Sequence, residues 1–154
     1  MQRSVKKKLL LTPEEYGKYY KICDSLPFAF TDIEMVFNEE KKAVDWIFRY
    51  GNEALATLEK LPLDKMIGNS FSSLFSNMDA KWLHVYERAT LYGETLEIMD
   101  YSPEIDTNLK IICFPTFPGH CGCILFNADQ MKSISEENHL VRLAAVAMKS
   151  NPTI

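Results

Sequence analysis

Cysteine and histidine residues occur together near the end of the sequence, where His120 is followed by Cys121 and Cys123. Both side-chain types bind zinc, but a structural zinc site needs four ligands, usually as two separated pairs, and only one pair is present here. In a strand, Cys121 and Cys123 share one face while His120 points to the other. We therefore interpret the two cysteines as small apolar residues of a packed strand. A thiol cluster with Cys113 from a neighbouring strand remains an alternative.

Carboxylates are the second group of residues with chemical potential, because two of them on one face can act as an acid and a base. Asp32 and Glu34 share a face of a predicted strand, and Glu97 faces outward on another. An antiparallel sheet with one solvated face gives the same alternation, and we favour that interpretation. A further acidic cluster at a turn lacks the dense ligand series of a calcium loop: Asp100, Glu104 and Asp106.

The three histidines do not indicate a nucleophilic site. His84, His120 and His139 fall in separate predicted elements, without a serine motif or a nucleophile elbow beside them. The sequence has no glycine-rich phosphate loop. We therefore predict that the domain itself is not an enzyme. A small enzyme with a helix-lined pocket stays a further hypothesis, which needs a buried titratable pair that the sequence does not identify.

Length and composition are those of one globular domain. The 154 residues are 47% hydrophobic and 25% charged, and the net charge of −4 argues against nucleic acid as a partner. No segment approaches the roughly 20 apolar residues of a membrane helix, so we expect no direct membrane insertion. Four cysteines suit a reducing compartment, and we predict a cytoplasmic protein. The basic run Arg3 to Lys8 is interpreted as a solvated terminus.

The elements that position these residues follow from the hydrophobic pattern. Thr12, Pro13 and Glu15 form a capping box and start a helix over 13–24, whose tyrosines must bury against the chain's own sheet or a second copy. Alternation of apolar and polar residues predicts five strands: 29–38, 43–50, 95–101, 108–117 and 121–127. Val44, Trp46, Phe48 and Tyr50 are predicted to share one face of the second strand. Helical patterns predict further helices: 53–60, 63–67, 70–76, 79–92 and 135–149.

This order predicts an α+β fold, with a five-stranded antiparallel sheet, helices packed on one face and flanking helices at both ends. Several short sequence motifs, which occur in this order, resemble those of a PAS domain of the bacterial sensory type. They are Asn52 with Ala54-Leu55, Ile67-Gly68 with Phe71 and Phe75, Tyr86 with Ala89 and Gly93-Glu94, and Pro118-Gly119. The resemblance covers 27–129. It leaves 1–26 as a basic tail with a flanking helix and 130–154 as a C-terminal linker and helix. Asn127-Ala128-Asp129 departs from the Asp-Ile-Thr-like ending of many PAS domains.

The resemblance also limits the cofactors. Flavin photosensors of the family carry a reactive cysteine in the helices after the second strand, and 52–92 contain none. Trp82, rather than His84, aligns near the haem-ligand position, so neither haem nor flavin is supported. The aromatic residues expected between sheet and helices fill a core or line a ligand pocket: Trp46, Phe48, Phe71, Phe75, Trp82, Tyr86, Phe114 and Phe126.

The resemblance implies a sensory or regulatory domain of a signal-transduction protein, of the two-component or cyclic-dinucleotide kind. Such a domain binds a small ligand or a partner and relays the change through its flanking helices, usually as a homodimer and to an output domain. The alternative is a ligand-free interaction or dimerisation module that uses the helices at 13–24 and 135–149. The sequence does not identify the ligand.

Overall fold

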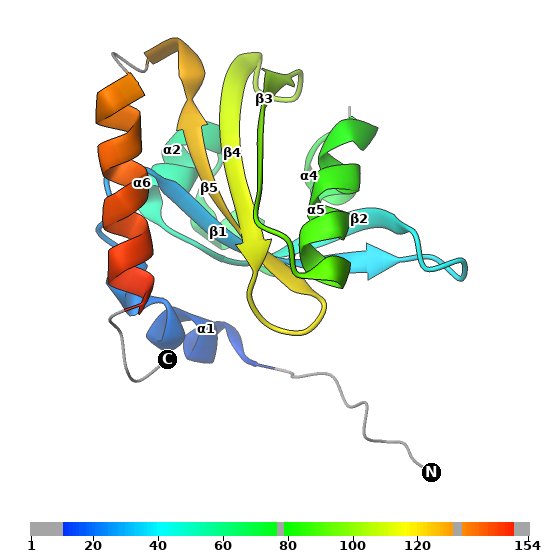
Figure 1. The fold of residues 1–154 in the computed structure, drawn as a ribbon. Helices are drawn as coiled ribbons and strands as arrows, with labels where there is room; N and C mark the ends of the chain where they lie inside the picture. Colours follow the sequence, from blue (N-terminus) through cyan, green and yellow to red (C-terminus); the bar gives the residue numbers. More distant parts are fainter. Residues whose placement is uncertain (1–10, 77–78, 131–133, 150–154) are drawn as a thin grey trace.

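The computed structural model describes residues 11–76, 79–130 and 134–149. Its centre is one antiparallel sheet of five strands in the order β2-β1-β5-β4-β3 (Figure 1). The strands are β1 (Ala29–Phe37), β2 (Ala43–Gly51), β3 (Leu96–Ser102), β4 (Thr107–Pro115) and β5 (His120–Asn127). Each predicted strand is present with ends shifted by no more than a few residues, and the predicted fold class is confirmed.

The four helices between β2 and β3 cover one face of the sheet, which we call the inner face. They are α2 (Glu53–Glu59), α3 (Leu63–Met66), α4 (Phe71–Leu74) and α5 (Ala80–Tyr92). The Asp79 side chain caps α5 by accepting from the backbone N–H of Lys81, and Gly93 ends the helix in the left-handed conformation at φ +68°. Apolar residues of these helices and of all five strands form the inner core.

The flanking helices cover the opposite, outer face. They are α1 (Pro13–Tyr19), followed by a 3-10 turn (Lys21–Cys23), and α6 (Ile134–Lys149). The capping box of Thr12 and Glu15 is formed as predicted, although the α-helix ends at Tyr19. Tyr16 and Tyr20 are buried in an outer core with Phe30, Tyr50 and residues of β5 and α6. Tyr16 lies in α1 and Tyr20 directly follows it, and both therefore pack against the chain's own sheet.

A β-bulge between β1 and β2 corrects one prediction about side-chain direction. Asp32 pairs with Tyr50 while its neighbour Ile33 pairs with Phe48, so Arg49 is an extra residue in β2. A bulge reverses the alternation beyond it. Trp46 and Phe48 therefore lie in the inner core as expected, but Tyr50 lies in the outer core. Val44, expected on the face of Trp46, is exposed.

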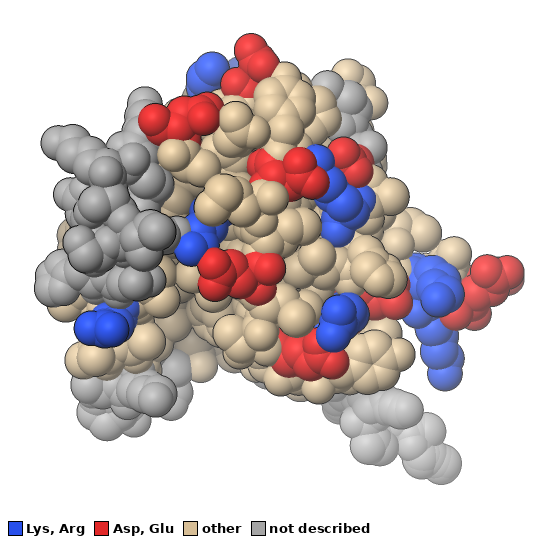
Figure 2. Space-filling model, turned by 45° about the horizontal axis from the view of Figure 1, so that its top comes forward, with Lys and Arg blue, Asp and Glu red and all other residues tan. Residues whose placement is uncertain are grey.

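The charged surface is mixed. Figure 2 shows acidic and basic side chains interspersed over a mostly uncharged face. Ion pairs account for several of them, including Lys110 with Glu97 at 2.7 Å and Arg88 with Glu94 at 2.6 Å. Within the described residues, no helix combines the length and the apolar character that a membrane span needs. The basic run at 3–8 lies outside the described residues.

Candidate functional site

The inner face holds a small cavity between the sheet and α2–α5. It has a volume of about 20 Å³, which is room for about one water molecule. Five of the predicted pocket residues line it: Trp46, Phe48, Phe71, Trp82 and Tyr86. The remaining lining comes from α2, the β3–β4 turn and the central strands: Thr31, Ile33, Glu59, Glu104, Leu109, Ile111, Cys123 and Leu125.

The other three predicted pocket residues lie elsewhere. Phe75 is partly buried and packs its ring against Phe71, with centroids 4.8 Å apart. Phe114 and Phe126 pack with the outer core, because alternation along β4 and β5 turns their side chains away from the inner face. Phe126 instead lines an open groove of about 630 Å³ with residues such as Pro27 and Lys60. The sequence identified the aromatic residues but assigned these two to the wrong face.

Two carboxyl groups, those of Glu59 and Glu104, line the cavity although the sequence did not predict them there. Glu59 is 6% exposed, and its Oε1 has no hydrogen-bond partner among the described residues. Burial and the nearby Glu104 raise the pKa of Glu59 to about 8. The signal was helical spacing, since Glu59 lies four residues after the fully buried Leu55 and thus on the buried face of α2.

Two further buried polar atoms of cavity-lining residues have no hydrogen-bond partner in the part of the chain that the structure describes. They are Oε1 of Glu104 and the indole Nε1 of Trp82. Glu104 belongs to the turn between β3 and β4, and it is the one lining residue that is half-buried rather than buried. The cavity is therefore lined by two acidic residues, of which Glu59 is buried and Glu104 half-buried.

The three cysteines of β4 and β5 also lie on the inner face. Cys113 pairs directly with Cys123, and Cys121 lies two residues along the same strand. The thiol cluster left open by the sequence is therefore present, as free thiols. Burial raises the pKa of the Cys113 thiol to about 12. Protonated thiols are poor nucleophiles and poor ligands, and the described residues contain no cluster suited to a metal ion.

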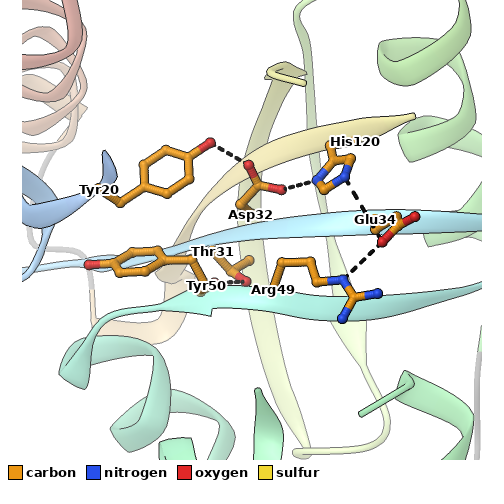
Figure 3. Close-up of polar contacts among 7 residues, drawn as sticks. All are labelled: Tyr20, Thr31, Asp32, Glu34, Arg49, Tyr50 and His120. Carbon is orange, nitrogen blue, oxygen red and sulfur yellow. Dashed lines mark hydrogen bonds and ion pairs between the residues drawn. The ribbon is translucent and has the colours of Figure 1, made fainter. Parts of the chain in front are cut away.

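The outer face carries a buried polar network (Figure 3), which consists of Tyr20, Asp32, His120, Glu34 and Arg49. Asp32 accepts a hydrogen bond from the Tyr20 hydroxyl, and its other oxygen lies 2.7 Å from Nδ1 of His120. Nε2 of His120 is 4.0 Å from Oε1 of Glu34, which accepts from Nε of Arg49 at 2.9 Å. Asp32 is fully buried and Glu34 nearly so. The prediction that both carboxylates are solvated is wrong, because α1 covers this face.

Aromatic residues pack against this polar network. Tyr16 stacks on His120 with ring centroids 6.0 Å apart, and Phe117 contacts both rings edge-on. Burial, followed by the charge of Asp32, raises the pKa of Tyr20 well above its ordinary value. Tyr20 therefore stays protonated and remains a hydrogen-bond donor to Asp32. His120 was singled out by the sequence, but as a neighbour of cysteines; the structure turns it to the other face, as strand alternation predicts.

Asn52 joins the two faces at the end of β2. Its Oδ1 accepts from the backbone N–H of Leu55, which caps α2, and from that of Phe30 on β1. Its Nδ2 donates to the carbonyls of Cys23 and Phe28. The sequence predicted that Asn52 would hold a local turn. The structure confirms this and adds contacts to β1 and to the segment after α1.

β1 lies between the cavity and the network. Thr31 and Ile33 line the cavity, while Asp32 between them points to the outer face. β1 therefore contributes side chains to both the cavity and the network. The Asp32–His120 pair has no serine or cysteine nucleophile bonded to it among the described residues, and it does not line the cavity. This arrangement is suited to coupling α1 to the sheet.

Comparison with protein-family models finds no match for this sequence, and comparison with curated proteins finds none either. Among solved structures, the chain is similar to one described as an RNA-binding Light-Oxygen-Voltage receptor, at 15% identity and a TM-score of 0.49. That likeness covers 90% of this chain but only 39% of the other. The strand order, with α2–α5 on the inner face, is the PAS-like α+β fold that the sequence resemblance implied.

Proposed function

We propose that this chain is a sensory or regulatory domain in which occupation of the inner cavity is relayed to α1 on the outer face. One observation carries the proposal: consecutive residues of β1 face the cavity and the Tyr20–Asp32 hydrogen bond. A ligand that favours one position of β1 shifts the equilibrium between two arrangements of α1. We further propose a cytoplasmic, bacterial signalling protein, with a two-component or cyclic-dinucleotide output domain and a homodimer formed through flanking helices.

The proposal is tested by measuring thermal unfolding with a panel of small amines, acids and neutral polar compounds, followed by hydrogen exchange of the α1 amides. A compound that raises Tm is expected to change exchange in α1 as well as in the cavity-lining helices. No change in Tm with any compound would remove the ligand-sensing function. A change confined to the inner face would remove the relay.

A ligand-free dimerisation module is the second candidate, favoured by α6. Leu143 and Val146 on this helix are 49% and 62% exposed. In a dimer they would be covered, whereas Tyr16 and Tyr20 of the N-terminal flank are already buried within the chain. Light scattering of the full chain is expected to give a dimer that dissociates in the Leu143→Lys/Val146→Lys variant. Leu91→Lys on α5 is the matched exposed control. A wild-type monomer at high concentration would exclude this candidate.

The enzyme hypothesis required a buried titratable pair, and the structure offers the buried Glu59 with the half-buried Glu104 beside it. A cavity of about 20 Å³ has no room for an organic substrate beside them. We therefore keep the proposal of a non-catalytic domain. Turnover of any panel compound that depends on Glu59 would overturn it.

A further inference from the structure

We propose that the inner cavity binds the ammonium ion, a small cation with N–H donors. Glu59 and Glu104 are its acceptors. This inference rests on the proposed ligand-sensing function and names the chemical class of its ligand.

Two carboxyl oxygens of the cavity lining have unmet hydrogen-bonding capacity. Oε1 of Glu59 and Oε1 of Glu104 are buried acceptors without a partner in the part of the chain that the structure describes. An unpartnered buried carboxyl oxygen is costly, and a donor placed between the two removes that cost. The Trp82 indole N–H, also buried and unpartnered, is a third polar group of a lining residue. An ionised carboxylate has lone pairs enough to accept from both the indole and a ligand.

The charges of the cavity-lining residues favour a cation. The titratable groups that line the cavity are Glu59 on α2, Glu104 in the β3–β4 turn, Tyr86 on α5 and Cys123 on β5. None of them is basic, so a bound cation meets two carboxyl groups and no positive side chain. Burial and the charge of Glu104 raise the pKa of Glu59 to about 8, and no basic side chain of the lining offsets them.

Aromatic residues form part of the cavity lining. Trp46, Phe71 and Tyr86 surround the cavity, with Trp46 to Phe71 and Trp46 to Tyr86 ring centroids 4.5 and 5.0 Å apart. Ring faces attract ammonium groups, most strongly where water is excluded. The volume fits one water-sized group, which an ammonium ion matches.

The experiment is a titration of the full chain with ammonium chloride, using Trp fluorescence and Tm as readouts. Sodium chloride at equal ionic strength and methanol are the comparison probes. We expect ammonium to raise Tm and change the fluorescence, with at least ten-fold weaker binding in Glu59→Gln. Glu53→Gln, an exposed position at the start of α2, is the control and keeps wild-type binding. Because Glu59 must lose its proton, affinity should rise by up to about ten-fold per pH unit below pH 8.

Each alternative outcome is decisive. If sodium chloride reproduces the effect, or Glu59→Gln binds as well as the wild type, the cation site is wrong. If methanol or another neutral compound binds and ammonium does not, the cation class fails while the ligand-sensing function stands. If no compound of the wider panel changes Tm, both proposals fall.

Discussion

Tyr20 donates its hydroxyl hydrogen to Asp32, which joins the N-terminal flanking segment to β1 of the sheet. Both side chains are buried, and Asp32 is also hydrogen-bonded to His120. A carboxylate in this position would be costly without such partners. The bond therefore holds the segment that follows α1 against β1.

Removal of the Tyr20 hydroxyl should loosen this attachment. Tyr20→Phe keeps the ring packing but deletes one hydrogen bond to a buried carboxylate, and we expect a loss of about 1–3 kcal/mol in the free energy of unfolding. Amides of α1 should exchange faster. Equilibrium denaturation and hydrogen exchange measure the two effects. Tyr19→Phe is the matched control, because Asp32 accepts no hydrogen bond from Tyr19. Equal behaviour of the two variants would contradict this role for Tyr20.

Asn52 should be among the most sensitive polar positions in the chain. Asn52→Ala deletes four hydrogen bonds of a buried side chain, although Leu55 N–H and the Cys23 carbonyl each keep a backbone partner. We expect it to cost about 3 kcal/mol in denaturant unfolding. Asn69→Ala, which removes an exposed bond to the carbonyl of Lys65, should cost less than about 1 kcal/mol. A small effect at Asn52 would show that these four bonds contribute little.

The buried Glu59 should make the ligand-free protein less stable as pH rises. Its pKa is raised to about 8 from 4.5, so the folded state keeps a proton that the unfolded state releases. Between these values the free energy of unfolding should fall by up to about 1.4 kcal/mol per pH unit, and level off above pH 8. Denaturation at several pH values measures this slope, which Glu59→Gln should remove. A slope that persists in Glu59→Gln would assign it to other groups.

Two glycines should respond oppositely to the same substitution. Gly93 ends α5 at φ +68°, so Gly93→Ala should destabilise by about 1 kcal/mol, although an added Cβ meets no atom there. Gly17 lies inside α1 at an ordinary φ with open space for a Cβ. Gly17→Ala should therefore stabilise by about 0.5–1 kcal/mol. Thermal unfolding of both variants checks the signs, and a stabilising Gly93→Ala would contradict the left-handed cap.

The sequence predicted elements better than it predicted which face each residue uses. Capping and turn residues act locally, which is why Thr12 and Gly93 marked helix ends correctly. Tyr50 was misassigned because a bulge depends on pairing between two strands. Asp32 was taken as solvated because the sequence cannot show that α1 covers the outer face. Glu59 could have been found from its spacing to Leu55, but its approach to Glu104 is a tertiary contact.

The central claim is that β1 couples the cavity to α1. Two double-mutant cycles in equilibrium denaturation test it most directly, pairing Tyr20→Phe with Ile33→Val and, separately, with Ile111→Val. Both isoleucines line the cavity and are 1% exposed, but only Ile33 adjoins Asp32 on β1. The account predicts a coupling energy above about 0.5 kcal/mol for Ile33 and additivity for Ile111. Additivity within about 0.3 kcal/mol in both cycles would contradict it.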